Sequence, residues 1–215
     1  MKIKAADAAA VFLVFLSVAL GGYVSTGSFD GYEVAYVRSF QQFAVASGLI
    51  PFFKLMTYVG SLYSWAAFAV LLLLVERRRP KRALKVGMFL LGISAVDLAF
   101  KVLFARPRPY RAFPNLVQGF ENENMSSYPS GHTSRVGGEW YFLRNGRPYL
   151  DALLAVLTVL ISLSRVALGV HYFTDTLGAF LLSYPLAYLT NRLGLYELAL
   201  KTVGLGKLAE GSSST

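Results

Sequence analysis

The sequence contains no cysteine and few charged residues, and both deficits restrict what the chain can be. Without cysteine, it can form neither a disulfide nor a metal site built from thiolates. Only 15% of its 215 residues are charged, whereas 55% are hydrophobic. That balance is too apolar for an ordinary soluble domain of this length, so most of the chain is expected to lie in a lipid bilayer.

The hydrophobic residues occur in long blocks rather than at the spacing of one face of a soluble helix or strand. A helix needs about 20 residues to cross roughly 30 Å of hydrocarbon. We therefore predict an all-α membrane protein in which residues 1–215 form one domain, a single bundle of six transmembrane helices. The predicted spans are Ala5 to Val24, Leu49 to Val75, Ala83 to Phe104, Ser130 to Leu143, Leu150 to Gly169 and Tyr172 to Thr190.

Two of these spans allow a second interpretation. The first could be a cleaved signal peptide with a basic start, but its long apolar block has no clear small-residue cleavage site, which favours a retained span. The fourth is short and contains Arg135 and Glu139. These two residues are four positions apart and could pair on a helix face that neighbouring helices shield from lipid. The alternative is a re-entrant or interfacial segment.

The basic residues predict which way the bundle faces. If all six spans cross, most of the 21 Lys and Arg residues lie at one end of the bundle, which is then the cytoplasmic end. Both termini lie at that end as well. We expect a multi-pass protein of the plasma membrane. Nucleic acid is not an expected partner despite the formal charge of +9, because the basic residues cluster between hydrophobic blocks. The residues at the basic end are Lys2, Lys4, Arg77, Arg78, Arg79, Lys81, Arg82, Lys85, Arg144, Arg147, Arg192, Lys201 and Lys207.

The long connections 25–48 and 105–129 are then predicted on the outer side. In the first, Val34, Val37, Phe40 and Phe43 recur at helical spacing, which predicts a helix. It could lie in the membrane interface or cap the bundle. Residues 209–215 are small and polar and are expected to be disordered.

Three groups of polar residues fall at the predicted outer ends of the later spans, where they are expected to converge. The first holds Lys101, Arg106 and Arg108, with a proline after each arginine. Proline restricts the backbone, so the guanidinium groups could be held for bidentate binding of phosphate oxygens. Basic residues at the end of a span also commonly extend to lipid headgroups. Asp97 is expected to neutralise and orient Lys101, while Arg106 and Arg111 could bind a second phosphate or face solvent.

The second group, Ser130, Gly131 and His132, opens the fourth span. Ser130 suits the N-cap position, and Gly131 would let a phosphate approach backbone N–H groups at the positive end of the helix. His132 could donate a proton to a leaving oxygen, because an imidazole with its ordinary pKa of about 6.5 populates both protonation states near neutrality.

The third group contains Ser164, Arg165, His171 and Asp175. On a helix, the Asp175 carboxylate would lie one turn from His171 and accept the proton of one ring nitrogen, which leaves the other free to attack phosphorus. Arg165 adds a guanidinium for phosphoryl oxygens. Alone, the group could be a helix-end histidine bonded to a nearby carboxylate. Both histidines of the chain lie in these groups, beside polar residues that are unfavourable near hydrocarbon unless they have a function.

Together the three groups resemble the signature of the type 2 phosphatidic acid phosphatase (PAP2) superfamily, Lys-x6-Arg-Pro, then Pro-Ser-Gly-His, then Ser-Arg-x5-His-x3-Asp. All three parts match in order and spacing, over a core of about residues 83–190. The resemblance implies a membrane lipid phosphatase that forms a phosphohistidine and uses no metal or other cofactor. His171 would be the nucleophile, Asp175 would orient it and His132 would protonate the leaving group. The residues implied to hold the phosphoryl oxygens are Lys101, Arg108, Ser130, Gly131 and Arg165.

The expected substrate is a lipid phosphate or diphosphate at the outer leaflet, such as a polyprenyl diphosphate, phosphatidylglycerol phosphate or phosphatidic acid. A polyprenyl diphosphate is the first choice, because a spent carrier must be dephosphorylated across the membrane from its synthesis. One alternative is a phosphotransferase of the same fold that passes the phosphoryl group from His171 to an acceptor lipid. The other is an anion transporter, which would not need the pair of His171 and Asp175.

Overall fold

The computed structural model describes residues 3–78, 80–144 and 146–202. Within this part of the chain every regular element is an α-helix, so the predicted all-α class is confirmed. The tail 209–215 and the basic residues Lys2, Arg79 and Lys207 lie outside the described residues. The helices are α1 (Ala5–Ser25), α2 (Asp30–Ala46), α3 (Ile50–Val59), α4 (Leu62–Val75), α5 (Lys81–Phe104), α6 (Pro109–Ala112), α7 (Gly131–Leu143), α8 (Pro148–Ala167), α9 (Phe173–Arg192) and α10 (Leu195–Thr202).

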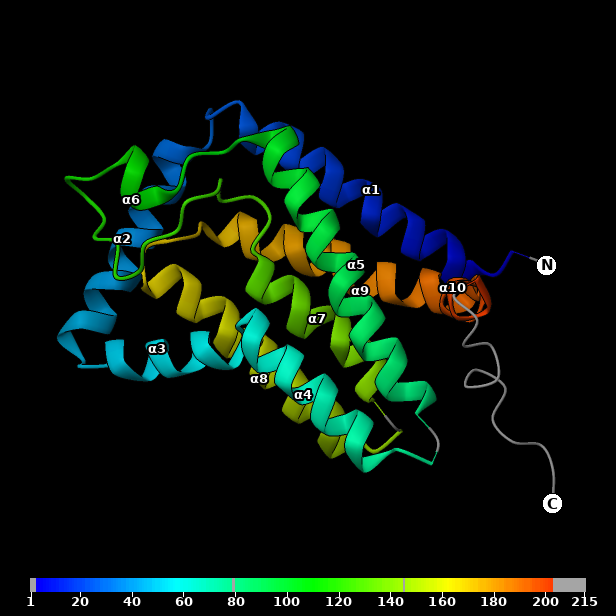
Figure 1. Ribbon diagram of the computed structural model, residues 1–215. Helices are drawn as coiled ribbons and strands as arrows, with labels where there is room; N and C mark the ends of the chain where they lie inside the picture. The colour runs from blue at the N-terminus through cyan, green and yellow to red at the C-terminus, as the bar shows by residue number, and fades with distance from the viewer. Residues whose placement is uncertain (1–2, 79, 145, 203–215) are drawn as a thin grey trace, which may run out of the picture.

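The short helix α7 lies inside the bundle. It packs most extensively against α9 and also contacts α5, α8 and α4, which surround it in Figure 1. Its bounds agree with the predicted fourth span, except that Ser130 is the N-cap residue and the helix begins at Gly131. Neighbours on several sides keep its polar residues away from lipid, as expected for a polar helix at membrane depth.

Arg135 and Glu139 do not pair within α7, so that prediction is wrong. Side chains on a helix lean toward its N-terminus, and Arg135 reaches in that direction, where its Nε donates to the Gly60 carbonyl at 3.2 Å. Glu139 is fully buried, and neither of its carboxylate oxygens has a hydrogen-bond partner. Although they are four residues apart, Arg135 binds the break between α3 and α4 and Glu139 lies buried without a partner.

The second predicted span, Leu49 to Val75, is not one helix. It breaks into α3 and α4 at Gly60 and Ser61, where Gly60 is the C-cap of α3 and the Ser61 hydroxyl accepts the Ser64 N–H as the N-cap of α4. Glycine and a serine that caps the next helix together favour a helix end over continuation. An unbroken apolar block had concealed this boundary.

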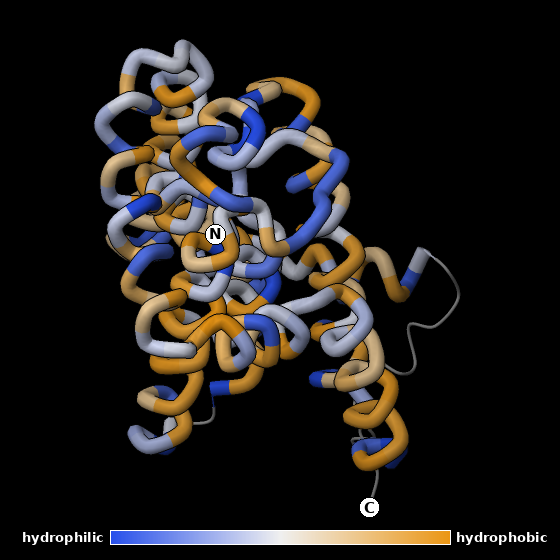
Figure 2. Tube along the Cα trace, turned by 90° about the vertical axis from the view of Figure 1, so that its left-hand side faces the viewer, coloured by the Kyte–Doolittle hydropathy of each residue, from blue (hydrophilic) through white to orange (hydrophobic). Residues whose placement is uncertain are grey.

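Three described segments are long and apolar enough to cross a membrane: α1, the segment Lys81–Ala112 that begins with α5, and α8. A fourth candidate is the pair α2 and α3, which is bent by 112°. Figure 2 shows long hydrophobic stretches along the helices. These properties make the chain a membrane protein. They support three to four spans by length and composition, fewer than the six predicted.

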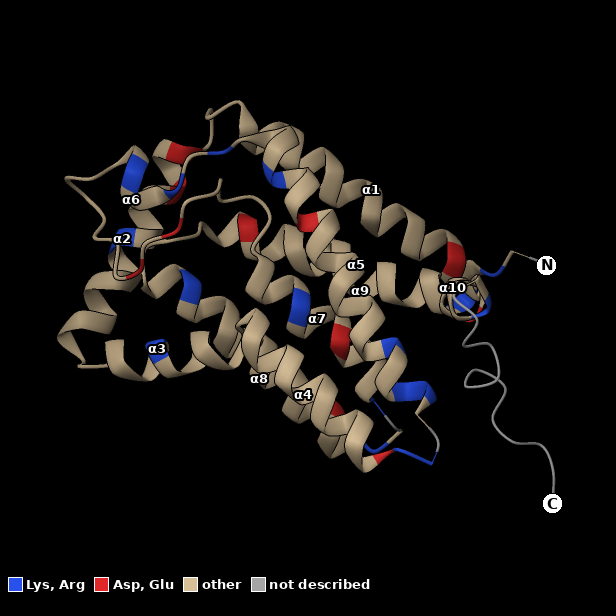
Figure 3. Ribbon diagram, viewed as in Figure 1, with Lys and Arg blue, Asp and Glu red and all other residues tan. Residues whose placement is uncertain are grey.

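The two ends of the bundle differ. In Figure 1, the N-terminus, α10 and the turn between α4 and α5 lie toward one end, whereas α2, α6 and the connection from α8 to α9 lie toward the other. Figure 3 shows that most charged residues lie near these two ends and few along the middle of the helices. The polar groups singled out in the sequence all belong to the end that carries α2 and α6, which is called the site end below.

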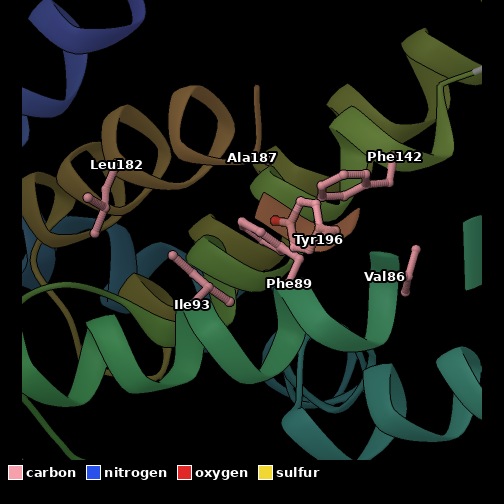
Figure 4. Packing of buried hydrophobic residues seen from close by; sticks show 7 residues of the cluster. All are labelled: Val86, Phe89, Ile93, Phe142, Leu182, Ala187 and Tyr196. Carbon is pink, nitrogen blue, oxygen red and sulfur yellow. The ribbon is translucent and has the colours of Figure 1, made fainter. Parts of the chain in front are cut away.

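The opposite end is held by an aromatic cluster. Phe89 of α5, Phe142 of α7 and Tyr196 of α10 are buried and point toward one another in Figure 4. The ring centroids of Phe142 lie 5.5 Å from Phe89 and 5.6 Å from Tyr196, within the range of favourable aromatic pairs. This packing fixes the spacing of α5 and α7, whose other ends carry the polar residues.

Helix α2 caps the bundle at the site end. Val34 and Val37 are buried and pack in one cluster with Val117, Val166 and Tyr172. Polar residues of α2 are also buried, among them Glu33 and Gln41, and the Gln41 amide donates to the carbonyls of Gln118 and Ala167. The buried side of α2 contacts protein as the capping alternative predicts, while Tyr32, Tyr36 and Phe43 are exposed, as a helix in the membrane interface would require.

Candidate active site

The residues of the three polar groups come together at the site end. Lys101 lies in the last turn of α5, Arg108 just after that helix, Arg165 in the last turn of α8, and Asp175 in the first turn of α9. The convergence follows from topology, because each group terminates or begins a helix at the same end of the bundle (Figure 1). The eight predicted site residues are Lys101, Arg108, Ser130, Gly131, His132, Arg165, His171 and Asp175.

His171 lies between a carboxylate and a guanidinium in the turn from α8 to α9. Its Nδ1 is 3.3 Å from Oδ2 of Asp175, which also accepts the Tyr172 N–H at 2.9 Å. Its Nε2 is 3.1 Å from Nη1 of Arg108. A guanidinium can only donate, so Nε2 is the unprotonated nitrogen and Nδ1–H donates to the carboxylate. The histidine thus presents the tautomer that a nucleophile at Nε2 requires.

His171 is also neutral near physiological pH. Burial lowers the pKa of His171 well below its ordinary value, and the positive charges of Arg108 and Lys101 lower it further. The residue is 1% exposed. The lone pair on Nε2 is therefore kept unprotonated by the same cations that could hold a phosphate.

Arg106 is fully buried and contacts three carboxylates. Its Nη1 donates to Oδ1 of Asp175 at 2.6 Å, and its Nη2 donates to Asp30 at 2.6 Å and to Glu33 at 3.0 Å. The expectation that Arg106 binds a second phosphate or faces solvent is wrong, because its side chain has no exposure and its donors are directed at protein oxygens. It holds the carboxylate oxygen of Asp175 that does not face His171.

Lys101 joins the end of α5 to the segment before α7. Its Nζ donates to the carbonyls of Pro129 at 2.8 Å and Ser126 at 2.9 Å. Asp97 was expected to neutralise and orient this amine. Its charge does act on Lys101, but the predicted orienting bond is wrong, since Oδ1 of Asp97 accepts the Ser134 hydroxyl at 2.9 Å. The amine of Lys101 therefore binds the carbonyl groups of Ser126 and Pro129 rather than the carboxylate of Asp97, one helical turn before it.

The start of α7 is fixed to the start of α9. The Ser130 N–H donates to the Asp175 carbonyl at 3.1 Å, while the Ser130 hydroxyl makes no capping bond to α7. A Cβ placed on Gly131 would lie 3.2 Å from Nη1 of Arg135, so glycine leaves room for that guanidinium. Two positions before Ser130, the Tyr128 hydroxyl donates to the Ser17 carbonyl of α1 at 2.6 Å. Helix α1 therefore helps to position this turn.

His132, the second residue of α7, belongs to the same site. The residue is partly buried, and the positive charges of Arg165 and Arg135 act on its imidazole. A Cβ placed on Gly60 would come within 3.3 Å of its Cδ2, so the break between α3 and α4 lies beside the ring. Both histidines of the chain therefore lie at the site end.

Arg165 and Arg108 are occupied by two acidic residues that the sequence had not indicated. Arg165 donates to Glu121 and to Glu123 at 2.5 Å each, and it also hydrogen-bonds Thr57. The second oxygen of Glu123 lies 3.4 Å from Arg108. Burial raises the pKa of Glu123, but the charges of Arg165 and Arg108 outweigh it and hold that pKa below its ordinary value. Both guanidinium groups are thus bound to anions.

The carboxylates of the site end bind arginine side chains. In the described ranges of the chain, no group of three or more His, Asp or Glu side chains could hold a metal ion. The remaining arginine of this region, Arg111, is exposed and donates to the Glu123 carbonyl at 2.6 Å, which fits the solvent-facing alternative. The site thus contains two imidazoles, several cations and the carboxylates that bind them.

Comparison with known proteins identifies the family of the chain. The model of the PAP2 superfamily matches residues 81–198, more than half of the chain. An undecaprenyl-diphosphatase of Sulfolobus acidocaldarius is 30% identical over 160 residues, 74% of this chain and 75% of that protein. Phosphatidylglycerophosphatase B of Bacillus subtilis is 37% identical over 120 residues, 49% of this chain and 56% of that protein.

Two solved structures share the fold. A transmembrane PAP2 type phosphatidylglycerolphosphate phosphatase from Bacillus subtilis aligns with a TM-score of 0.68 and 22% identity, over 86% of this chain and 96% of that one. Aquifex aeolicus LpxE aligns with a TM-score of 0.58 and 22% identity, over 67% of this chain and 86% of that one. The chain belongs to the PAP2 superfamily. The predicted class of enzyme, a PAP2-type phosphatase, is confirmed by these relatives.

Proposed function

We propose that the chain hydrolyses a lipid phosphate or diphosphate through a phosphohistidine on His171, without a metal ion. The observation that supports this most directly is the orientation of His171, with Nδ1 bound to Asp175 and Nε2 directed at Arg108. A group that binds phosphate oxygens thus lies next to the nitrogen that would attack phosphorus. Phosphoryl transfer depends mainly on such positioning and on charge stabilisation.

The reaction would proceed in two displacements. Nε2 of His171 attacks phosphorus while the bond from phosphorus to the leaving oxygen breaks, and His132 donates a proton to that oxygen. Water, activated by His132, then cleaves the N–P bond and releases inorganic phosphate. The cations that would stabilise the transferred group in both steps are Lys101, Arg108 and Arg165, together with Ser130 and the N–H of Gly131.

A polyprenyl diphosphate is the proposed substrate. The relative that covers the larger share of this chain carries the name undecaprenyl-diphosphatase, whereas the relative named for phosphatidylglycerophosphate covers about half. With a lipid diphosphate, the first displacement would release the lipid monophosphate as the leaving group. Phosphatidylglycerol phosphate and phosphatidic acid are the substrates to compare with it.

Phosphate release in detergent with EDTA present tests this function. We expect release from at least one of the three lipids, with the highest kcat/KM for the polyprenyl diphosphate, and no loss of rate on adding EDTA, because the fixed cations replace a metal ion. Release from none of the lipids would contradict the proposed function. Activity that EDTA abolishes and Mg²⁺ restores would contradict the metal-independent mechanism.

We further propose that the chain is one membrane domain with six spans in the plasma membrane, with the site end outside and the termini inside. The basic residues around the turn from α4 to α5 support this orientation. Because the chain lacks cysteine, single cysteines can report it directly. In intact cells, a membrane-impermeant maleimide is expected to label Asn122→Cys at the site end and to label Arg78→Cys only after permeabilisation. The reverse pattern would invert the proposed topology.

A further inference from the structure

Two carboxylates from the connection between α6 and α7 cover the arginines of the site. Glu121 and Glu123 each bind Arg165 at 2.5 Å, and Glu123 also faces Arg108. The Arg165 and Arg108 side chains are 0% and 1% exposed, whereas those of Glu121 and Glu123 keep 27% and 31% of their exposure. The acidic side chains therefore bind the arginines from the solvent side, the direction from which a phosphate would have to enter.

The carboxylates satisfy these arginines only in part. Nε of Arg165 is buried without a hydrogen-bond partner. Arg108 uses Nη1 to contact Nε2 of His171, which engages the lone pair of the proposed nucleophile. A phosphoryl group offers three oxygens where a carboxylate offers two, so it could occupy the free donor and draw Arg108 away from the histidine. The two arginines thus form an anion site in which carboxylates, which bind less strongly than a phosphoryl group would, occupy the place of the phosphate.

Release of this anion would not require the loop to open. The Glu123 backbone is held on both sides, since its N–H donates to the Tyr110 hydroxyl at 3.3 Å and its carbonyl accepts that hydroxyl at 3.1 Å. Rotation of the partly exposed glutamate side chains would uncover the guanidinium groups while this backbone stays in place. The positive charges of Arg165 and Arg108 hold the pKa of Glu123 low. Glu123 therefore stays ionised and can bind these arginines again.

We infer that Glu121 and Glu123 act as an internal anion that occupies the phosphate site at rest, leaves when a lipid phosphate enters, and returns to displace inorganic phosphate. This inference rests on the proposed function of the site. Three cations in a buried site would otherwise retain the dianionic product strongly, because charge interactions are stronger and less screened by salt where water is excluded. The two glutamates would then set the affinity of the site for phosphate and the rate of product release.

The inhibition of lipid hydrolysis by inorganic phosphate tests this role. Glu123→Gln is expected to lower the inhibition constant for inorganic phosphate by about tenfold, because one charge-assisted competitor for Arg165 is lost. The double variant Glu121→Gln with Glu123→Gln should lower it further. KM for the lipid should fall as well, and kcat should fall where product release limits turnover. Phosphate-dependent stabilisation against heat, which needs no turnover, should rise in the same order.

Two control variants separate this effect from a change of charge or of the loop. Glu76→Gln removes one negative charge at the opposite end of the bundle, and Asn122→Ala changes an exposed side chain between the two glutamates. Both should keep the inhibition constant of the unaltered protein. An unchanged or higher constant in Glu123→Gln, in a protein that still hydrolyses lipid phosphate, overturns the inference and leaves the proposed function intact. Tighter phosphate binding in a protein that hydrolyses no lipid phosphate would support the anion role and contradict the proposed function.

Discussion

Replacing His171 with alanine is expected to lower kcat/KM for lipid phosphate hydrolysis by at least about 10⁴-fold, since removing a covalent nucleophile eliminates the reaction path. His171 is buried and held by Asp175 and Arg108, which fix its Nε2 beside a cation. Phosphate release measures the loss. Mass spectrometry after an alkaline quench should detect phosphorylation of the peptide that contains His171 in the unaltered protein and none in His171→Ala.

The matched comparison is His132→Ala, which should depend on the leaving group. General acid catalysis contributes about 10²- to 10⁴-fold when the leaving oxygen is basic and much less when it is not. We therefore expect His132→Ala to lose far more activity on an alkyl phosphate than on a nitrophenyl phosphate, whereas His171→Ala loses both. Equal losses for the two variants on both substrates would contradict the assigned roles. So would a His171→Ala protein that keeps more than a few per cent of its activity.

The motif residues could be located from the sequence because their positions depend on local rules. His171 and Asp175 are four residues apart, and the structure places Nδ1 of one beside Oδ2 of the other. Helix α7 begins at Gly131, directly after Ser130 at the expected N-cap position, although the Ser130 hydroxyl makes no capping bond. Each motif also lies where a helix begins or ends, so the order of the helices was sufficient to bring the motifs to one end of the bundle.

The sequence did not reveal the acidic residues of α2 that bind the site end, because they lie far from their partners in the chain. Asp30 and Arg106 are 76 positions apart, and Glu33 lies 141 positions before Thr174, whose N–H it accepts at 2.6 Å. On a helix considered alone, Asp30 and Glu33 are simply acidic residues in the first turn of α2. Their role depends on α2 packing against α8, which hydrophobic spacing does not specify.

Two local errors have a different cause. The break at Gly60 and Ser61 was present in the sequence, but the apolar residues on both sides extended the predicted span across it. The pairing of Arg135 with Glu139 followed a rule for exposed helix surfaces, where such pairs have no stronger competitor. Inside the bundle, the Gly60 carbonyl left open by the helix break binds Arg135 instead.

The Arg106 network should account for much of the stability of the site end. Arg106→Met would leave Asp30, Glu33 and Asp175 buried without their shared cation, and breaking a buried ion pair from one side costs about 3–5 kcal/mol. We expect a correspondingly large fall in the free energy of unfolding, measured in detergent by chemical denaturation. Arg111→Met in the same connection removes an exposed guanidinium and should change that free energy by less than about 1 kcal/mol.

A combined variant separates the stabilising role of Arg106 from its effect on Asp175. Adding Asp30→Asn and Glu33→Gln to Arg106→Met removes two of the three uncompensated charges, so much of the lost stability should return. The remaining carboxylate of Asp175 would still lack the donor that holds its Oδ1, and it would orient His171 less firmly. The folded combined variant should therefore show a lower kcat with little change in KM. Full activity in that variant would mean that Arg106 stabilises the fold without positioning the catalytic carboxylate.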